Sequence, residues 1–277
     1  MGRDFPLDQV RRDVDCCIEI WSEILSEDLQ DRVEYAYAKG SCIKHWSSPI
    51  DYVPVFSDVD IHIKLRYGRN FYPDSYEGFV ESLSTTEAYE DMFGERNSDP
   101  VHLPRVQVVL LNPNLSDPDF MLPWDLGMIR PMVGEPLLGE PPEHTLLRSM
   151  DLRNLLNQVE VLGALPLSAC ERTGLDYWIL VRRLGWRVSP TPVRLLSQVV
   201  EDPLRVWGLN RTDVCEELEA HGFGDVSTSC KEYYLSGWEA FRSDFRDSRA
   251  MREALKAAYR VLETTIKHAR ELSKRDA

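Results

Sequence analysis

Hydrophobic and polar residues alternate along residues 59–65, and this period of two predicts a strand with one buried face. Valine, isoleucine and leucine occupy the odd positions of the run. Asp60, His62 and Lys64 share the opposite face with Asp58, which directly precedes the strand. Two carboxylates therefore point the same way where the strand begins. We interpret His62 and Lys64 as an ordinary polar sheet face, and we do not favour His62 as a third metal ligand.

Other elements of the first half follow from the same kind of periodicity. Apolar residues at three- and four-residue steps predict an amphipathic helix over residues 8–29. A strand is predicted over residues 33–38 and a second helix over residues 75–93. The run RVQVVLLNP at residues 105–113 predicts a central strand that is buried on both faces.

The second half of the chain is predicted to be helical. Apolar stripes with helical spacing occur over residues 146–165, 176–186, 192–200, 212–221, 229–245 and 249–274. Thr212 resembles a capping residue at the beginning of its helix. A proline-rich, irregular segment over residues 112–142 separates these helices from the first half. We therefore expect an α+β protein with two domains: residues 1–142 with a mixed β-sheet, and residues 143–277 as an α-helical bundle.

The net charge of the chain bears on whether its partner is a nucleic acid. The chain has 277 residues, a formal net charge of −14 and a pI near 4.9. Nucleic acid requires a basic surface, so this charge makes nucleic acid a less favoured partner. The oligomeric state stays open, and a homodimer is one alternative.

Cysteines and apolar runs indicate the compartment. The six cysteines form no C-x-x-C pair, which is typical of reduced thiols in a cytoplasmic protein. The first residues are charged and do not resemble a signal peptide. No apolar run approaches the length of a membrane span, so we expect no membrane partner.

The paired carboxylates carry the candidate chemistry. Like charges this close together repel one another, and a divalent cation is the usual way in which proteins stabilise such a pair. Hard oxygen ligands suit Mg²⁺, which keeps several waters and takes substrate phosphates as further ligands. Asp58 and Asp60 are therefore the candidate metal ligands.

A Gly-Ser pair upstream of the carboxylates suggests a phosphate site. Gly40 would let the backbone approach a phosphate closely, and a following helix would present free amide groups. Ser41 would add a hydroxyl donor and Lys44 a positive charge. The alternatives are a simple helix cap for Ser41 and a solvated surface lysine for Lys44.

A Gly-Ser turn, a basic residue soon after it, and Ser-Asp-x-Asp at the start of a strand resemble the DNA polymerase β nucleotidyltransferase superfamily. The chain departs from the family pattern by an inserted loop over residues 46–54. The resemblance implies a nucleotidyltransferase fold for the first domain, with Asp58 and Asp60 as catalytic residues and Mg²⁺ ligands. It also implies four positions that bind the nucleotide: Gly40, Ser41, Lys44 and Ser57.

The implied activity is Mg²⁺-dependent transfer of a nucleoside monophosphate from an NTP to a hydroxyl-type acceptor, with release of pyrophosphate. The layout is closest to small-molecule and antibiotic nucleotidyltransferases and to minimal nucleotidyltransferase domains. In such a layout the helical domain binds the acceptor. The acidic composition favours a small molecule or a protein as acceptor, and an enzyme that adds nucleotides to RNA ends is the alternative.

A third carboxylate on a later strand is part of the family pattern, and Gln107 stands at the matching position. Glutamine is neutral and cannot act as a general base. Three explanations stay open. The carboxylate comes from Asp117, Asp119 or Asp125; the reaction needs no protein base; or the domain binds a nucleotide or a partner without catalysis.

Overall fold

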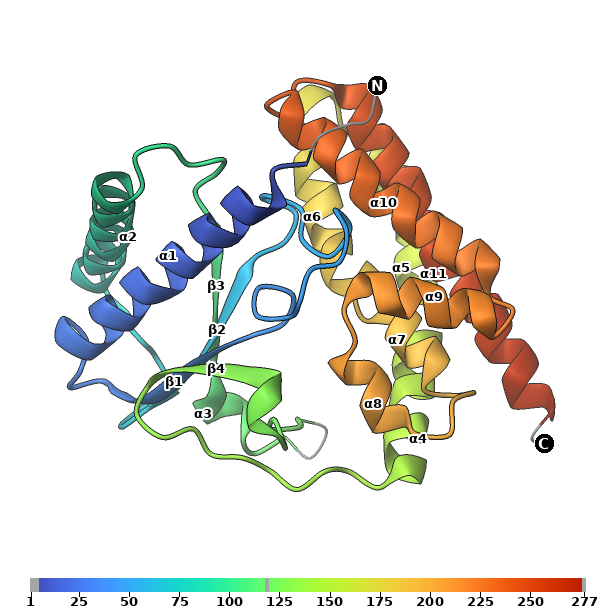
Figure 1. Cartoon of the computed structure of the whole chain (residues 1–277), viewed down its shortest axis with the longest axis horizontal. Coiled ribbons are helices and arrows are strands. Elements are labelled where there is room, and N and C mark those ends of the chain that lie inside the picture. Colours follow the sequence, from blue (N-terminus) through green and yellow to red (C-terminus); the bar gives the residue numbers. More distant parts are fainter. Residues whose placement is uncertain (1–4, 118–119, 276–277) are drawn as a thin grey trace. The chain divides into compact units, whose positions relative to one another are not determined.

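A computed structural model describes residues 5–117 and 120–275 of the chain (Figure 1). The protein is a mixed α/β structure that divides into two compact units. The first, here called the sheet unit, comprises Met1–Lys44 and Ser57–Pro141. The second, the helical unit, comprises His45–Phe56 and Pro142–Ala277. No helix in the described ranges is both long enough and apolar enough to cross a membrane.

The sheet unit contains a four-stranded mixed sheet in the order β3-β2-β1-β4. Strand β1 pairs antiparallel with β2 and β4, and β2 pairs parallel with β3. Helix α1 contacts β1, β2 and β4. The elements are α1 (Leu7–Glu27), β1 (Val33–Lys39), β2 (Val59–Leu65), α2 (Tyr76–Arg96), β3 (Val106–Leu110), α3 (Leu111–Asn114), η1 (Leu126–Met128) and β4 (Ile129–Val133).

The alternation predicted for residues 59–65 is confirmed. Val59, Ile61 and Ile63 are completely buried, whereas the polar residues between them are partly exposed. The helix predicted over residues 75–93 also forms, because the Ser75 side chain accepts a hydrogen bond from the Gly78 amide and caps α2.

The prediction of a central, buried strand over residues 105–113 is wrong. Strand β3 ends at Leu110 and lies at the edge of the sheet, where the Val108 side chain is 37% exposed. The physical reason lies in the next residues. Pro113 cannot donate a ladder hydrogen bond. The Asn112 side chain pairs with Leu65 instead, accepting from its N–H at 2.7 Å and donating to its carbonyl at 3.1 Å.

Strand β4 was missed within the segment predicted to be irregular. It carries Pro131 opposite Tyr37 of β1, and it forms the other edge of the sheet. Proline is tolerated in strands mainly at such edges, because there it need not donate to a neighbouring strand. The prolines of this segment led us to predict an irregular structure where a short edge strand forms.

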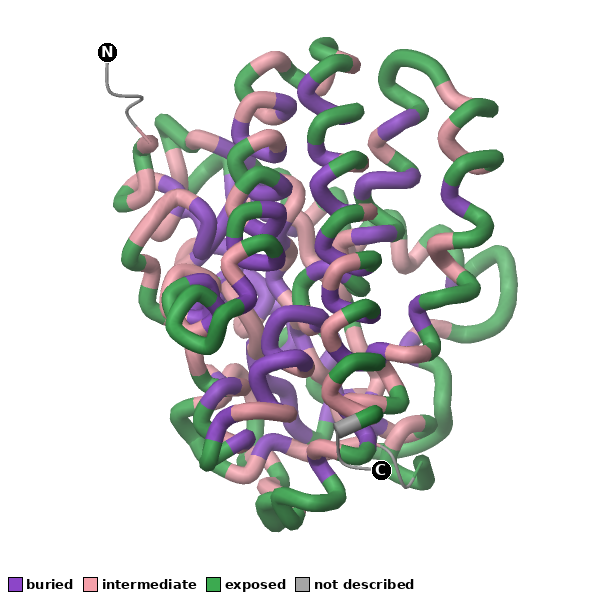
Figure 2. The backbone as a smooth tube through the Cα atoms, turned by 90° about the vertical axis from the view of Figure 1, so that its right-hand side faces the viewer, coloured by how far each residue is buried: buried purple, intermediate pink, exposed green. Residues whose placement is uncertain are grey.

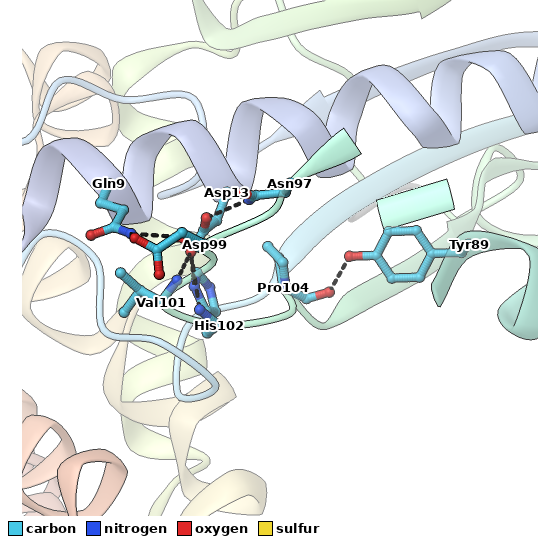
Figure 3. A network of polar contacts seen from close by, with 8 residues as sticks. All are labelled: Gln9, Asp13, Tyr89, Asn97, Asp99, Val101, His102 and Pro104. Atoms are coloured by element: carbon cyan, nitrogen blue, oxygen red, sulfur yellow. Dashed lines mark hydrogen bonds and ion pairs between the residues drawn. The ribbon is translucent and has the colours of Figure 1, made fainter. Parts of the chain in front are cut away.

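Helix α1 holds the loop between α2 and β3 through the completely buried Asp13 (Figure 3). The Asp13 carboxylate accepts hydrogen bonds from the backbone N–H groups of Val101 at 2.9 Å and His102 at 3.0 Å. The Asn97 side-chain amide donates to it at 2.7 Å, and His102 Nδ1 lies 3.1 Å from it. These bonds hold the loop that leads through Arg105 into β3.

We expect Asp13→Asn to weaken the fold most at neutral pH. Burial acts to raise the pKa of Asp13, but the hydrogen bonds from His102 and Asn97 lower it overall below its ordinary value. A lowered carboxyl pKa in the folded state contributes stability above the unfolded pKa near 4, and this is lost as pH falls through the folded pKa. Urea denaturation should show a loss of about 1–3 kcal/mol at pH 7 and a smaller loss near pH 3.

The matched control for this prediction is Asp91→Asn, which changes an exposed carboxylate on α2. It should leave the unfolding free energy unchanged at both pH values. A loss for Asp13→Asn that is the same at pH 3 and pH 7 would contradict the assignment of a lowered pKa.

The helical unit contains the C-terminal helices and one short segment from the first half of the chain. Buried and exposed positions alternate along these helices, as expected for amphipathic helices packed together (Figure 2). Helices α10 and α11 contact each other along their lengths. The elements are α4 (His144–Leu156), α5 (Val159–Cys170), η2 (Gly174–Asp176), α6 (Tyr177–Val188), α7 (Thr191–Leu196), α8 (Pro203–Gly208), α9 (Arg211–Ala220), α10 (Gly224–Arg242) and α11 (Ser248–Arg275).

Two details of the helical prediction are corrected. The helix predicted over residues 146–165 is divided into α4 and α5 at residues 157–158. The capping residue of α9 is Asn210, whose side chain accepts from the Asp213 N–H at 2.8 Å. Thr212 binds a carboxylate from a distant segment instead.

That segment is His45–Phe56, which contains the predicted inserted loop and belongs to the helical unit. Asp51, 2% exposed, holds it there. Its Oδ1 accepts from the Thr212 N–H at 2.8 Å, and its Oδ2 accepts from the Thr212 hydroxyl at 2.8 Å. Oδ2 also accepts from the N–H groups of Ser47 at 2.7 Å and Ser48 at 2.9 Å. One carboxylate thus closes the segment on itself and joins it to α9.

We expect Asp51→Ala to destabilise the protein by about 2–4 kcal/mol, because it leaves several buried donors without an acceptor. Thr212→Val removes only one of the four donors and should cost about 1 kcal/mol. Chemical denaturation measures both losses, and hydrogen exchange should show faster exchange of the Ser47, Ser48 and Thr212 amides in Asp51→Ala. Equal losses for the two variants would show that Asp51 does not hold the segment.

Candidate functional site

Sheet register brings three polar residues into one row within the sheet unit. Asp60 of β2 pairs with Lys39 of β1 on one side and with Gln107 of β3 on the other. Asp58 directly precedes β2, and Arg105 directly precedes β3. We call these five residues the carboxylate cluster. The structure thus places the predicted carboxylates Asp58 and Asp60 together with the neutral Gln107.

Arg105 is the partner of Asp58. Its Nη2 donates to Asp58 Oδ2 at 2.9 Å, and the two side chains are only 20% and 18% exposed. The Nε and Nη1 atoms of Arg105 are buried and have no hydrogen-bond partner among the described residues. Unpaired buried donors of a guanidinium group are costly, and an anion such as a phosphate would satisfy them.

Lys39 supplies a second positive charge. Burial lowers the pKa of Lys39, and the neighbouring Asp60 charge partly offsets that effect. From the sequence, we expected a divalent cation to offset the repulsion between the two adjacent carboxylates. In the structure, two protein cations, Lys39 and Arg105, already lie beside these carboxylates.

Gly40 connects the turn to the carboxylates. Its φ of +90° is unfavourable for other residues, and a Cβ on it would lie only 2.9 Å from Asp60 Oδ2. Glycine is therefore required for two reasons at this position. The turn places the Gly40 backbone directly against one carboxylate of the cluster.

The helix predicted to follow Gly40 does not form, and this expectation is corrected. Residues 41–43 form a turn in which the Ile43 N–H donates to the Gly40 carbonyl at 3.3 Å. The reason is tertiary, because Arg11 of α1 binds the carbonyl groups of Cys42 at 2.7 Å and Lys44 at 2.5 Å. Those carbonyls are held by a guanidinium group and do not accept helical hydrogen bonds. A helix dipole therefore does not contribute here.

The remaining predicted nucleotide-binding residues differ in their exposure. Ser41 and Lys44 are partly exposed in the turn. Ser57, which precedes Asp58, is 2% exposed. Direct phosphate binding by Ser41, Lys44 and Ser57 stays a prediction from the sequence.

His62 lies on the same face of β2 as Asp60, two residues further along the strand. Its ring stacks on Tyr37 with 5.1 Å between centroids and 14° between planes. Burial, with a further contribution from the Lys39 charge, lowers the pKa of His62 to about 4. His62 is thus neutral at pH 7 and packs as an aromatic ring, rather than lying on a simply solvated face.

A third carboxylate from Asp117, Asp119 or Asp125 stays a prediction from the sequence. Asp125 Oδ1 accepts from the Gly127 N–H at 2.6 Å and caps η1. Asp119 lies outside the described residues. Within residues 5–117 and 120–275, no three histidine, cysteine or acidic side chains gather in a group that could hold a metal.

The chemistry of Asp58 and Asp60 nevertheless fits Mg²⁺. Both supply hard carboxylate oxygens, and Arg105 donates to Oδ2 of Asp58. Mg²⁺ is commonly bound by one or two carboxylates, with water and substrate phosphates as its other ligands. Two carboxylates are within the number of protein ligands that Mg²⁺ sites commonly use.

Comparison with known proteins adds no family assignment. No protein family, no curated protein and no solved structure gives a significant match to the chain. Two residues of the carboxylate cluster, Lys39 and Arg105, were not among the candidates predicted from the sequence. In the sequence, Lys39 ends one strand and Arg105 directly precedes another. These positions indicate proximity to Asp58 and Asp60 only when the strand order is known.

We expect Gly40→Ala to destabilise the protein more than Gly68→Ala. Both glycines have positive φ, so each alanine carries backbone strain of about 1–2 kcal/mol. A Cβ at Gly68 meets nothing within 4 Å, whereas one at Gly40 displaces the Asp60 carboxylate. Urea denaturation of the two variants isolates this contact, and equal losses would show that Asp60 moves without cost.

Proposed function

We propose that the protein is a Mg²⁺-dependent nucleotidyltransferase whose sheet unit has the nucleotidyltransferase fold. It would transfer a nucleoside monophosphate from an NTP to a hydroxyl-type acceptor and release pyrophosphate. The observation that carries the proposal is the position of Asp58 and Asp60 at the start of β2, against the Gly40 turn. The unpaired N–H groups of Arg105 beside them support the same conclusion.

Three residues of the cluster and Gly40 have defined roles in this proposal. Asp58 and Asp60 hold Mg²⁺, which when bound neutralises the triphosphate and lowers the pKa of the acceptor hydroxyl. Arg105 donates Nε–H and Nη1–H to phosphate oxygens while Nη2 holds Asp58. Gly40 admits a phosphate close to the backbone because it has no side chain.

Gln107 limits what the protein can do with the acceptor proton. Its amide can orient a hydroxyl by hydrogen bonds, but it cannot remove the proton. Phosphoryl-type transfers depend mainly on positioning and on stabilisation of negative charge, so a protein base is not indispensable. The acceptor is a small molecule or a protein, because the net charge of −14 disfavours an RNA end.

A second candidate function is nucleotide binding without catalysis. The observation that favours it is the register of Gln107 directly beside Asp60, where a third carboxylate would complete the site. The two functions share the nucleotide site and differ only in pyrophosphate release.

We expect NTP to raise the unfolding temperature of the parent protein only when Mg²⁺ is present. A ligand at 100 times its dissociation constant should stabilise the fold by about 2.7 kcal/mol. Asp58→Asn and Asp60→Asn should abolish the shift. The control is Asp31→Asn, an exposed carboxylate of the same unit. Differential scanning fluorimetry with each of the four NTPs, with and without Mg²⁺, measures the effect and identifies the base.

Pyrophosphate release separates the two candidate functions. Release by the parent with a panel of hydroxyl acceptors supports the transferase, whereas nucleotide binding with release only after Gln107→Asp supports the binding protein. Mg²⁺-dependent shifts that persist in both Asp58→Asn and Asp60→Asn would contradict the site itself.

A further inference from the structure

A second candidate site lies within the helical unit, apart from the carboxylate cluster. It is a cavity of about 780 Å³ lined by residues of α5, α6 and α7 and by Gln158. Pockets of 300–1,000 Å³ are typical for small organic ligands. Six of the lining residues are arginine or tryptophan: Trp178, Arg182, Arg183, Trp186, Arg187 and Arg194.

The charge of this cavity is opposite to that of the chain. Four arginines line it and no aspartate or glutamate does, although the protein has 46 acidic residues against 32 basic ones. Arg187 is held in place, because its Nη1 donates to Gln158 Oε1 at 2.9 Å. Gln158 is in turn fixed by donating from Nε2 to the Asn154 carbonyl at 3.0 Å. The arrangement presents fixed positive charge to the cavity.

Arg194 lies at the buried side of the cavity. Its Nε is buried, has no hydrogen-bond partner in the part of the chain that the structure describes, and lies 3.7 Å from Asp151 Oδ1. Burial raises the pKa of Asp151 to about 6. Asp151 lies beside Arg194 and is not among the residues that line the cavity.

Apolar and aromatic surface accompanies these charges. The Trp186 side chain is 65% exposed and Ile179 is 45% exposed, while Leu180 and Leu184 are buried. Exposed tryptophan offers a flat surface on which another aromatic ring can stack. Arginine binds carboxylate and phosphate groups through paired N–H donors.

We propose that this cavity binds a small organic anion with an aromatic body, whose acidic group contacts the arginines and whose ring stacks on tryptophan. A free inorganic anion would leave the apolar lining uncovered, and a neutral aromatic molecule would bring no negative charge to the arginines. The site is formed by the helical unit alone and requires neither Mg²⁺ nor the carboxylate cluster.

The test uses 1-naphthyl phosphate as the probe, with 1-naphthol as the uncharged analogue and inorganic phosphate as the anion without a ring. Binding is measured by tryptophan fluorescence and by calorimetry in the presence of EDTA. We expect 1-naphthyl phosphate to bind at least tenfold more tightly than either comparison compound. AMP and 1-naphthoate then show whether the site prefers a nucleotide or an aromatic carboxylate.

Substitutions of the lining residues test whether the probe binds in this cavity. Arg183→Gln and Arg187→Gln should each weaken binding of 1-naphthyl phosphate about tenfold, and Trp186→Ala should weaken binding of all aromatic probes. Arg270→Gln, an exposed arginine of α11 that does not line the cavity, is the matched control and should change nothing. Asp58→Asn should also leave this binding unchanged, which separates its outcome from that of the nucleotidyltransferase proposal.

Three results would overturn the inference. Equal affinity for 1-naphthol and 1-naphthyl phosphate would show that the arginines do not select an anion. An equal loss in Arg270→Gln would indicate non-specific charge attraction. A change of oligomeric state in Arg187→Gln or Trp186→Ala by sedimentation, without probe binding to the parent, would assign this surface to contact between copies of the chain.

Discussion

The two carboxylates at the start of β2 must be placed next to positive charge, and much of the sheet unit serves that requirement. Asp13 of α1 binds the loop that leads into β3, and Arg105 at the end of this loop donates to Asp58. The Gly40 turn lies against Asp60 while Arg11 of the same helix binds the turn's carbonyl groups. Helix α1 therefore holds the backbone on both sides of the cluster with two charged residues two positions apart.

Chain connectivity joins this cluster to the second unit. The chain leaves the sheet unit after Lys44 and returns at Ser57, so the turn and the carboxylates are connected through a segment of the helical unit. Asp51 fastens that segment to α9 with buried hydrogen bonds. Arg211 and Trp238 also donate to carbonyl groups of this segment, so its length in the sequence does not imply a free insertion between the two halves of the motif.

The two proposed sites differ in the charged side chains that they combine. In our proposals, the carboxylate cluster binds a metal and phosphates, with Asp58 and Asp60 beside two cations, and the cavity of the helical unit binds an anion without a metal. Among the described residues, four arginines and no carboxylate line that cavity. In an acidic protein, both arrangements gather positive charge in one place, which favours an anion there.

Local patterns in the sequence were sufficient for the secondary structure of β2, α1 and α2, because burial of one face imposes a period of two or 3.6 on neighbouring residues. The proximity of Asp58 and Asp60 is likewise local, since it follows from their spacing. The sequence could not predict that Lys39, Arg105 and Gln107 join them, because register between strands depends on strand order. The edge position of β3 and the docking of His45–Phe56 were also decided only by tertiary structure, through hydrogen bonds of Asn112 and Asp51 to residues distant in the chain.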